Sequence, residues 1–165
     1  MRNGAFVIPV QHLSEDDNIF DLSAPLSVLG EINLNGSVSV HATVKKMEDR
    51  LLLHCDIDVS GTYSCDRCLD EYNGGFQTSY EQWYELGGRE MEYADEDVIP
   101  IPREARHIVI DEDLREAVLA GKPVKFLCSD GCKGICTECG KNRNHEICTC
   151  SDPAGKLGLI EFAQL

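Results

Sequence analysis

The segment from Cys128 to Cys150, CSDGCKGICTECGKNRNHEICTC, most strongly constrains this chain, because it places six cysteines within 23 residues. Disulfides, a redox-active dithiol and metal ligands are three possible uses for these thiols. The N-terminal segment has a single arginine and no continuous apolar stretch, so it does not resemble a signal peptide, and no window has the length of a membrane span. We therefore expect a soluble, cytosolic protein, in which thiols stay reduced and disulfides are the weakest explanation.

The spacing of four of these cysteines predicts a closed metal site. Cys136 and Cys139 are separated by two residues and followed by Gly140, which can supply the positive φ that a tight knuckle turn needs. Cys148 and Cys150 are two positions apart, so both sulfurs face the same side of an extended segment. Four thiolates are the ligand set of a structural zinc site, and we expect these four cysteines to bind Zn²⁺.

A second four-thiolate site follows by elimination. Cys65 and Cys68 come directly after a predicted strand, and Cys128 and Cys132 open the cysteine-rich segment. A metal ion shared by these pairs would hold that segment to the sheet. The exchange of Cys132 and Cys136 between the two sites remains an alternative at this stage, and the chain could hold one or two zinc ions.

Two other uses of the thiolates are alternatives to zinc. Cys65 and Cys68 could form a redox dithiol, although such motifs usually begin a helix within a βαβ unit, and no such unit surrounds them. Iron–sulfur clusters also take thiolate ligands, but the spacing matches neither ferredoxin pattern. Closed thiolate sites leave no position for a reacting water. The chain also lacks a serine nucleophile motif and a phosphate-binding glycine loop. We therefore expect a protein that is not an enzyme.

Period-two alternation in the first half predicts an antiparallel β-sheet. Apolar residues alternate with polar ones in GSVSVHATVKK and again in LLLHCDIDVSGTY, and the intervening MEDR offers a turn, so we expect a long hairpin. Cys55 lies on the apolar side of the second strand and is predicted to be a core residue, whereas His41 and His54 lie on the polar sides. A further strand is expected in FQTSYEQWYEL, after a turn at residues 73–75.

The second half predicts a loop, a helix and the cysteine-rich segment. Residues 86–105 contain glycines, prolines and an acidic run, and this composition predicts a linker. The segment RHIVI is a candidate short strand. A helix capped by Asp111 or Asp113 should end at Gly121, and a short C-terminal helix is expected after Asp152. The predicted fold class is therefore mainly β (α+β), with a sheet domain over residues 1–105 and a helix plus zinc module over residues 106–165.

The charge distribution limits where nucleic acid could bind. The formal net charge is −14, and residues 1–120 carry 24 acidic and 9 basic side chains. Residues 121–147 carry five basic and three acidic side chains. Because phosphate binding needs clustered Lys and Arg, any RNA contact is expected at Lys122, Lys125, Lys133, Lys141 and Arg143.

Two motifs resemble the YceD-like proteins, a bacterial family of large ribosomal RNA subunit accumulation proteins. One is a strand that ends in C-x-R-C-L, present here as Cys65 to Leu69. The other is LC-x3-CKG-[LI]-C-x2-CG-x-N-x-N, followed by C-x-C and Asp-Pro, present here from Leu127 to Pro153 and including Asn142 and Asn144. The chain departs from the family at residues 154–157, where AGKL replaces an Arg-Leu type helix, and at Arg143, where leucine is frequent.

The resemblance implies a role in the accumulation or processing of large-subunit ribosomal RNA and in ribosome assembly. The direct partner would be ribosomal RNA, a basic ribosomal protein or an assembly factor, and no small-molecule substrate is expected. The alternative is an interaction module in which zinc only fixes the shape.

Overall fold

The computed structural model describes residues 4–32, 34–87 and 98–150. The chain forms two compact units: a sheet unit, residues 1–63 and 72–124, and a cysteine unit, residues 64–71 and 125–165. This division differs from the boundary expected at residue 105. The helix belongs to the sheet unit, and the loop that carries Cys65 and Cys68 belongs to the cysteine unit.

The expected long hairpin forms the centre of the sheet unit. Strand β3, Gly36–Met47, pairs antiparallel with β4, Arg50–Ser64, across a tight turn. Val40 lies opposite Ile57 and Ala42 lies opposite Cys55, so the apolar positions of both strands share one buried face. The predicted strands, their apolar faces and the core position of Cys55 are confirmed.

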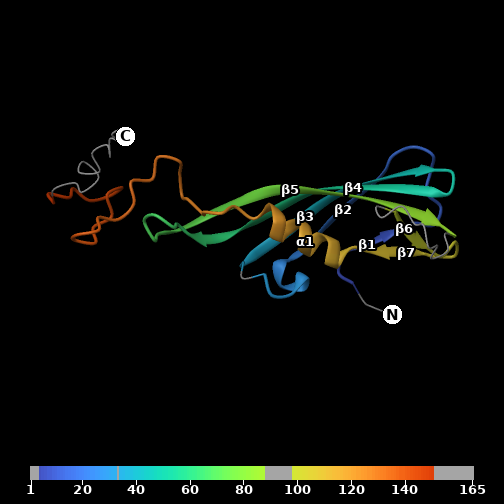
Figure 1. Ribbon diagram of the computed structural model, residues 1–165, viewed down its shortest axis with the longest axis horizontal. Helices are drawn as coiled ribbons and strands as arrows, with labels where there is room; N and C mark the ends of the chain where they lie inside the picture. The colour runs from blue at the N-terminus through green and yellow to red at the C-terminus, as the bar shows by residue number, and fades with distance from the viewer. Residues whose placement is uncertain (1–3, 33, 88–97, 151–165) are drawn as a thin grey trace, which may run out of the picture. The chain divides into compact units, whose positions relative to one another are not determined.

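Three further strands complete a five-stranded sheet with the order β2-β3-β4-β5-β6 (Figure 1). Strand β2, Asn18–Pro25, pairs antiparallel with β3, and β5, Glu71–Leu86, follows the cysteine-bearing loop. Strand β6, Val98–Ile101, pairs parallel with the end of β5. The fold is thus mainly β, as expected, with one α-helix among the described residues.

Two details of the sheet differ from the sequence-based prediction. Residues 73–75 lie inside β5 rather than in a turn. A Cβ atom on Gly75 would lie only 2.2 Å from the carbonyl oxygen of Val59, so this glycine permits close strand approach. Residues 98–101, assigned to the linker, form β6 instead.

The helix and a small second sheet complete the core of this unit. Strands β1, Val7–Pro9, and β7, His107–Val109, pair antiparallel; the RHIVI prediction is confirmed by β7. A 3-10 helix, η1, spans Leu26–Leu29, and α1 spans Asp111–Gly121 (Figure 1). Helix α1 ends at the predicted glycine and buries Leu114 and Val118 against the core.

The start of α1 is held differently from the expected cap at Asp111 or Asp113. Ile110 occupies the N-cap position and makes no side-chain capping bond. The carboxylate of Asp111 instead accepts hydrogen bonds from the backbone N–H groups of Ala5, at 2.8 Å, and Phe6, at 3.2 Å. Asp111 therefore fixes the N-terminal segment to the helix. The expected C-terminal helix lies outside the described residues.

Candidate metal centres in the cysteine unit

The first candidate metal centre brings together cysteines that are about sixty residues apart in the sequence. Cys65 and Cys68 lie in the loop between β4 and β5, and Cys128 and Cys132 lie after α1. The sulfurs of Cys65 and Cys132 are 3.7 Å apart, as are those of Cys68 and Cys128. The prediction that these two pairs meet is confirmed. This set is called the first group.

The second candidate metal centre consists of four cysteines that we call the second group: Cys136, Cys139, Cys148 and Cys150. The sulfurs of Cys139 and Cys148 are 3.6 Å apart. Within each group the four ligand atoms all lie within 4.8 Å of one another. The structure thus assigns Cys132 to the first group and Cys136 to the second, and the exchange considered from the sequence does not occur.

These sulfur separations suit metal coordination and exclude disulfides. Four thiolates bound tetrahedrally at about 2.3 Å from a zinc ion would lie about 3.8 Å from one another. A disulfide requires about 2.05 Å between the sulfurs, and all nine cysteines are free. Both groups could therefore hold a metal ion.

Each group contains a knuckle turn with the same backbone hydrogen bonds. In the first, the Cys65 N–H donates to the Asp70 carbonyl at 2.9 Å, and the Leu69 N–H donates to the Cys65 carbonyl at 2.8 Å. In the second, the Cys136 N–H donates to the Lys141 carbonyl at 2.8 Å, and the Gly140 N–H donates to the Cys136 carbonyl at 2.9 Å. The C-x2-C spacing thus folds both segments into one local structure that turns two sulfurs to the same side.

Backbone N–H groups inside the knuckles favour thiolates. The N–H groups of Cys139 and Glu138 lower the pKa of the Cys136 thiol to about 6. Burial raises the pKa of Cys65, but hydrogen bonds from the backbone of Cys128, Cys68 and Arg67 outweigh it, and the pKa falls to about 6. Each group therefore contains at least one cysteine that is predisposed to bind a metal ion as a thiolate.

Side chains around the first group hold its two segments together. Arg67 donates to the carbonyl oxygens of Asp130, at 3.3 Å, and Cys132, at 3.2 Å. Asp66 accepts from the Phe126 N–H at 2.7 Å through its carboxylate. These hydrogen bonds surround the ligands with fixed partners, as is usual for structural metal sites.

Asn144 contacts one of the candidate ligands, and the sequence did not predict this contact. Its side-chain nitrogen lies 3.3 Å from the sulfur of Cys132, and this contact lowers the pKa of the Cys132 thiol. The asparagines of the N-x-N motif were the available signal, but spacing alone does not reveal which sulfur they contact. His145, a possible substitute ligand from its position, instead lies 3.3 Å from a carboxylate oxygen of Asp70.

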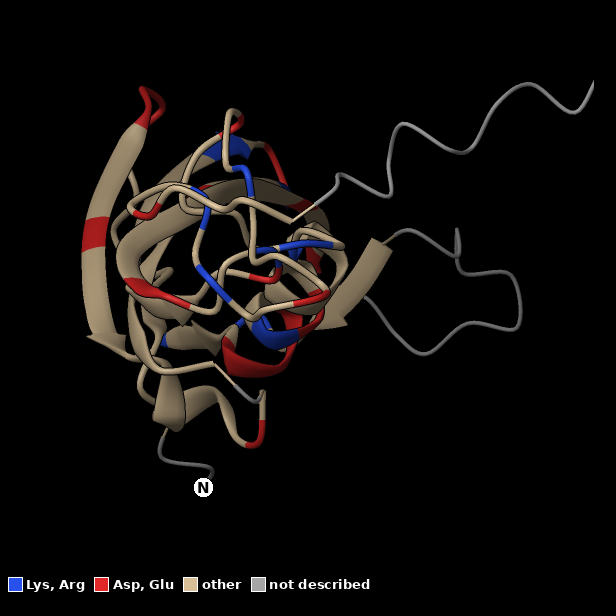
Figure 2. Ribbon diagram, turned by 90° about the vertical axis from the view of Figure 1, so that its left-hand side faces the viewer, with Lys and Arg blue, Asp and Glu red and all other residues tan. Residues whose placement is uncertain are grey.

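The five basic residues expected at an RNA contact are divided between the two units. Lys122 belongs to the sheet unit and the other four to the cysteine unit. Lys125, Lys133 and Lys141 are exposed, whereas Arg143 is half-buried. Figure 2 shows Lys and Arg interspersed with Asp and Glu in its view.

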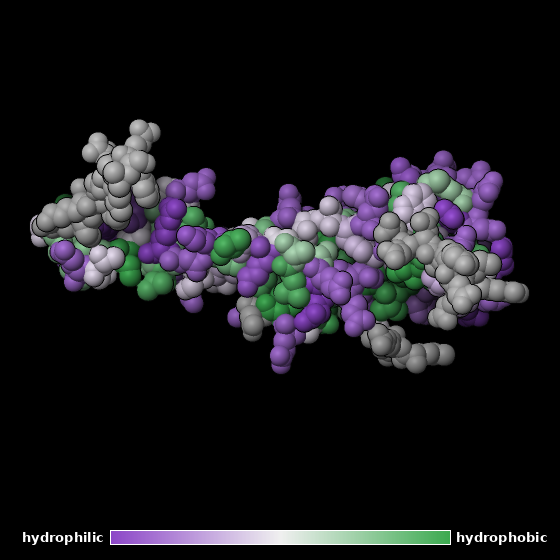
Figure 3. All heavy atoms as spheres, viewed as in Figure 1, coloured by the Kyte–Doolittle hydropathy of each residue, from purple (hydrophilic) through white to green (hydrophobic). Residues whose placement is uncertain are grey.

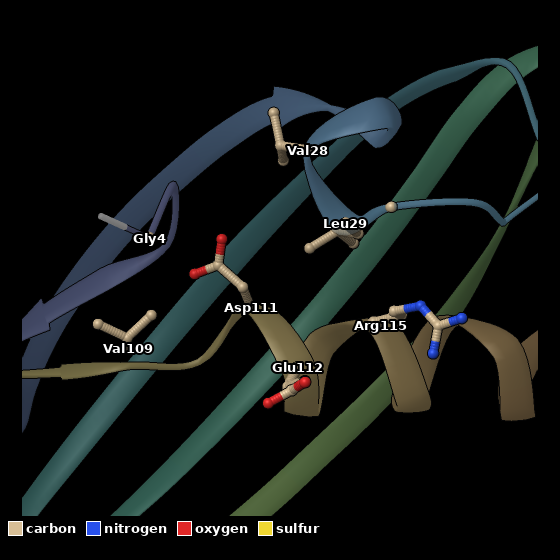
Figure 4. Close-up of a pocket in the computed structure, with 8 residues that line it drawn as sticks. Gly4, Val28, Leu29, Val109, Asp111, Glu112 and Arg115 are labelled. Carbon is tan, nitrogen blue, oxygen red and sulfur yellow. The ribbon is translucent and has the colours of Figure 1, made fainter. Parts of the chain in front are cut away.

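The sheet unit also contains a cavity of about 360 Å³, lined in part by Val28, Leu29 and Arg115 (Figure 4). The carboxylate of Asp111 projects toward the N-terminal segment around Gly4, where it accepts the backbone hydrogen bonds described above. The Asp111 carboxylate therefore stabilises the fold through these hydrogen bonds. The cysteine groups, not this cavity, concentrate the ligating side chains.

Among the described residues, no helix has the length and apolar character needed to cross a bilayer. The fold and the sites define a mainly β protein with a cysteine-rich unit able to hold metal ions. Residues 53–165 match the family described as Large ribosomal RNA subunit accumulation protein YceD, and the chain belongs to this family.

One relative is the Large ribosomal RNA subunit accumulation protein YCED homolog 1, chloroplastic, of Arabidopsis thaliana. It is 28% identical over 94 residues, which cover 57% of this chain and 26% of the relative. The chain thus matches about a quarter of that protein, and a plant relative shows that such proteins are not confined to bacteria. No solved structure matches the chain.

Proposed function

We propose that this chain is a non-enzymatic zinc protein of the cytosol that promotes large-subunit ribosomal RNA accumulation by docking a basic protein of the assembling ribosome. The observation that carries the proposal is the gathering of eight cysteine sulfurs into two groups of four in a member of the YceD family. A complete set of four thiolates supports a structural role for the metal, because it leaves no open coordination position. Free thiols support a reducing compartment.

The sulfur geometry favours zinc over the redox alternative. A dithiol reaction needs the sulfurs of Cys65 and Cys68 to be free to bond to each other. Here each of these sulfurs lies 3.7 Å from a cysteine of the distant pair, Cys132 or Cys128. A bound metal would consume the thiolates on which redox chemistry depends.

The charge of both units favours a basic protein over RNA as the direct partner. The sheet unit carries 21 acidic and 9 basic residues, and the cysteine unit carries 8 acidic and 6 basic residues. Each zinc ion with four thiolates adds a net charge of about −2, so metal binding makes the cysteine unit more acidic. The negative charge of the zinc-bound thiolates offsets the local excess of positive charge in residues 121–147. Phosphate would therefore be repelled, and a cationic protein surface attracted.

Two surfaces support protein docking. The open face of the sheet presents Asp56 and Asp58, which lie opposite His41 and Ser39 on β3. The cysteine unit exposes apolar side chains that protein interfaces use, with Leu69 63% exposed and Ile147 87% exposed. Figure 3 shows such apolar areas among hydrophilic side chains.

The test is association with large-subunit precursors, measured by sedimentation of the tagged full chain over a salt series. Asp56→Lys together with Asp58→Lys should weaken association, while Glu104→Lys, an exposed acidic control, should not. Neutralising Lys125, Lys133 and Lys141 should leave association intact. The opposite pattern, with loss only on removing the lysines, would identify RNA as the partner and overturn the docking proposal.

A further inference from the structure

The two cysteine groups are connected by hydrogen bonds through the loop of residues 140–147. Asn144 lies in this loop, between Cys139 and Cys148 of the second group, yet its side chain contacts Cys132 of the first group and the adjacent Lys133. Its nitrogen lies 3.3 Å from the Cys132 sulfur, and its oxygen accepts from the Lys133 N–H at 2.8 Å. The orientation of a first-group ligand therefore depends on a loop whose ends are held by second-group ligands.

A second set of contacts fixes the same loop to the first knuckle. The side-chain nitrogen of Asn142 donates to the Asp70 carboxylate at 2.6 Å, and its oxygen accepts from the Asn144 N–H at 2.9 Å. Asp70 ends the turn that carries Cys65 and Cys68. Asn142 thus holds Asn144 in place from the side of the first group.

The backbone between the groups is also tied down. The Ile135 N–H donates to the Arg67 carbonyl at 3.0 Å, and the Arg143 N–H donates to the Gly134 carbonyl at 2.9 Å. Only residues 133–135 separate Cys132 of the first group from Cys136 of the second. Neither group can be assembled without ordering a segment that the other group also needs.

We infer that the two cysteine groups bind metal cooperatively, and that Asn144 is the positioning residue through which occupancy of the second group tightens the first. This inference rests on the proposed metal binding. A metal ion at the second group would order residues 140–147. The N–H···S contact at Cys132 would then be in place before an ion binds to the first group. Loss of such contacts around metal ligands typically lowers metal affinity by about 10–100-fold. Linkage requires the reverse effect to be equally large.

The experiment titrates the full chain with Co²⁺ and then Zn²⁺ under reducing conditions, using thiolate charge-transfer absorption and native mass spectrometry. With less than saturating metal, cooperative binding predicts metal-free and two-metal chains with few one-metal chains. In Cys139→Ser with Cys148→Ser, the first group should bind Co²⁺ about tenfold or more weakly than in the intact chain.

Asn144→Asp keeps an oxygen for the Lys133 N–H but lacks the donor to sulfur, so one-metal chains should accumulate. Glu146→Ala, an exposed change in the same loop, is the matched control and should behave as the unaltered chain. Independent binding, with one-metal chains at the statistical level in the unaltered protein, would overturn cooperativity and leave the proposed zinc function standing. Failure of the chain to bind either metal would overturn both.

Discussion

Leu69 occupies in the first knuckle the position that Gly140 occupies in the second. Both residues donate the same turn-closing hydrogen bond, and both have positive φ, 63° for Leu69 and 72° for Gly140. A non-glycine residue in this conformation costs about 1–2 kcal/mol, and the Leu69 side chain is largely exposed. The turn therefore requires the conformation, and glycine is the residue that adopts it without strain.

We predict that Leu69→Gly leaves metal binding intact and changes the free energy of unfolding by less than about 1 kcal/mol. Relief of strain is offset by the greater flexibility of glycine in the unfolded chain. The reciprocal change Gly140→Ala should destabilise the cysteine unit by about 1 kcal/mol, because no atom near Gly140 blocks a Cβ and only the backbone conformation opposes it. Denaturant unfolding of the zinc-loaded proteins measures both. Equal, large losses in the two variants would contradict the equivalence of the turns.

Cys55 is predicted to act only as a small core residue. Its side chain is fully buried, and burial, followed by the charges of Asp56 and Asp113, raises its pKa to about 12, so the thiol stays neutral. Cys55→Val should cost less than about 1.5 kcal/mol, whereas Cys55→Ser should cost about 1–3 kcal/mol because its hydroxyl would be buried in an apolar environment. Thermal unfolding compares the two. Metal loss in Cys55→Val would show that the assignment of the metal ligands is wrong.

Asp113 provides a prediction about pH. Burial raises the pKa of this carboxyl. A hydrogen bond from Tyr80 lowers the pKa by a smaller amount, so the net shift is upward. A raised pKa in the folded state means that the folded chain binds the proton more tightly, so Asp113 destabilises the fold once the pH exceeds its unfolded pKa. Asp113→Asn should therefore raise stability at neutral pH, and this gain should shrink as the pH falls through the raised folded-state pKa and be absent below the unfolded pKa of about 4. A gain that persists unchanged at acidic pH would contradict the assignment.

The sequence predicts those features that depend on local periodicity and spacing. The alternation in residues 36–64 determines the buried face and the hairpin, and it places Cys55 inside. The C-x2-C motifs determine the knuckles, because two sulfurs at this spacing converge on one side of a turn. The two groups follow by elimination from these motifs and the remaining cysteines, but the choice between Cys132 and Cys136 comes from the structure.

Features that depend on distant contacts are not predictable in this way. Residues 98–101 form β6 only because they pair with β5, and they contain Pro100, which disfavours a strand locally. The composition of residues 73–75 predicts a turn, yet these residues lie in β5, where Gly75 allows β4 and β5 to approach closely. The contact of Asn144 with Cys132 depends on how two loops meet, which no period or spacing encodes.

Metal removal should disorder the cysteine unit and spare the sheet unit. Structural zinc contributes about 10–16 kcal/mol in peptide models, and residues 125–150 supply little buried apolar surface beyond their cysteines. Chelation, or Cys139→Ser, should therefore increase hydrogen exchange in residues 128–150 while β3 and β4 remain protected. Unchanged exchange after complete metal removal would show that the unit folds without metal.

The most direct measurement of the central claim is the metal and thiol content of the full chain, purified without chelator and examined by native mass spectrometry with elemental analysis. The account predicts two zinc ions per chain and nine reduced cysteines, with Cys139→Ser losing metal and Cys55→Val retaining both ions. A metal-free chain that carries a Cys65–Cys68 disulfide would contradict the account and support the redox alternative.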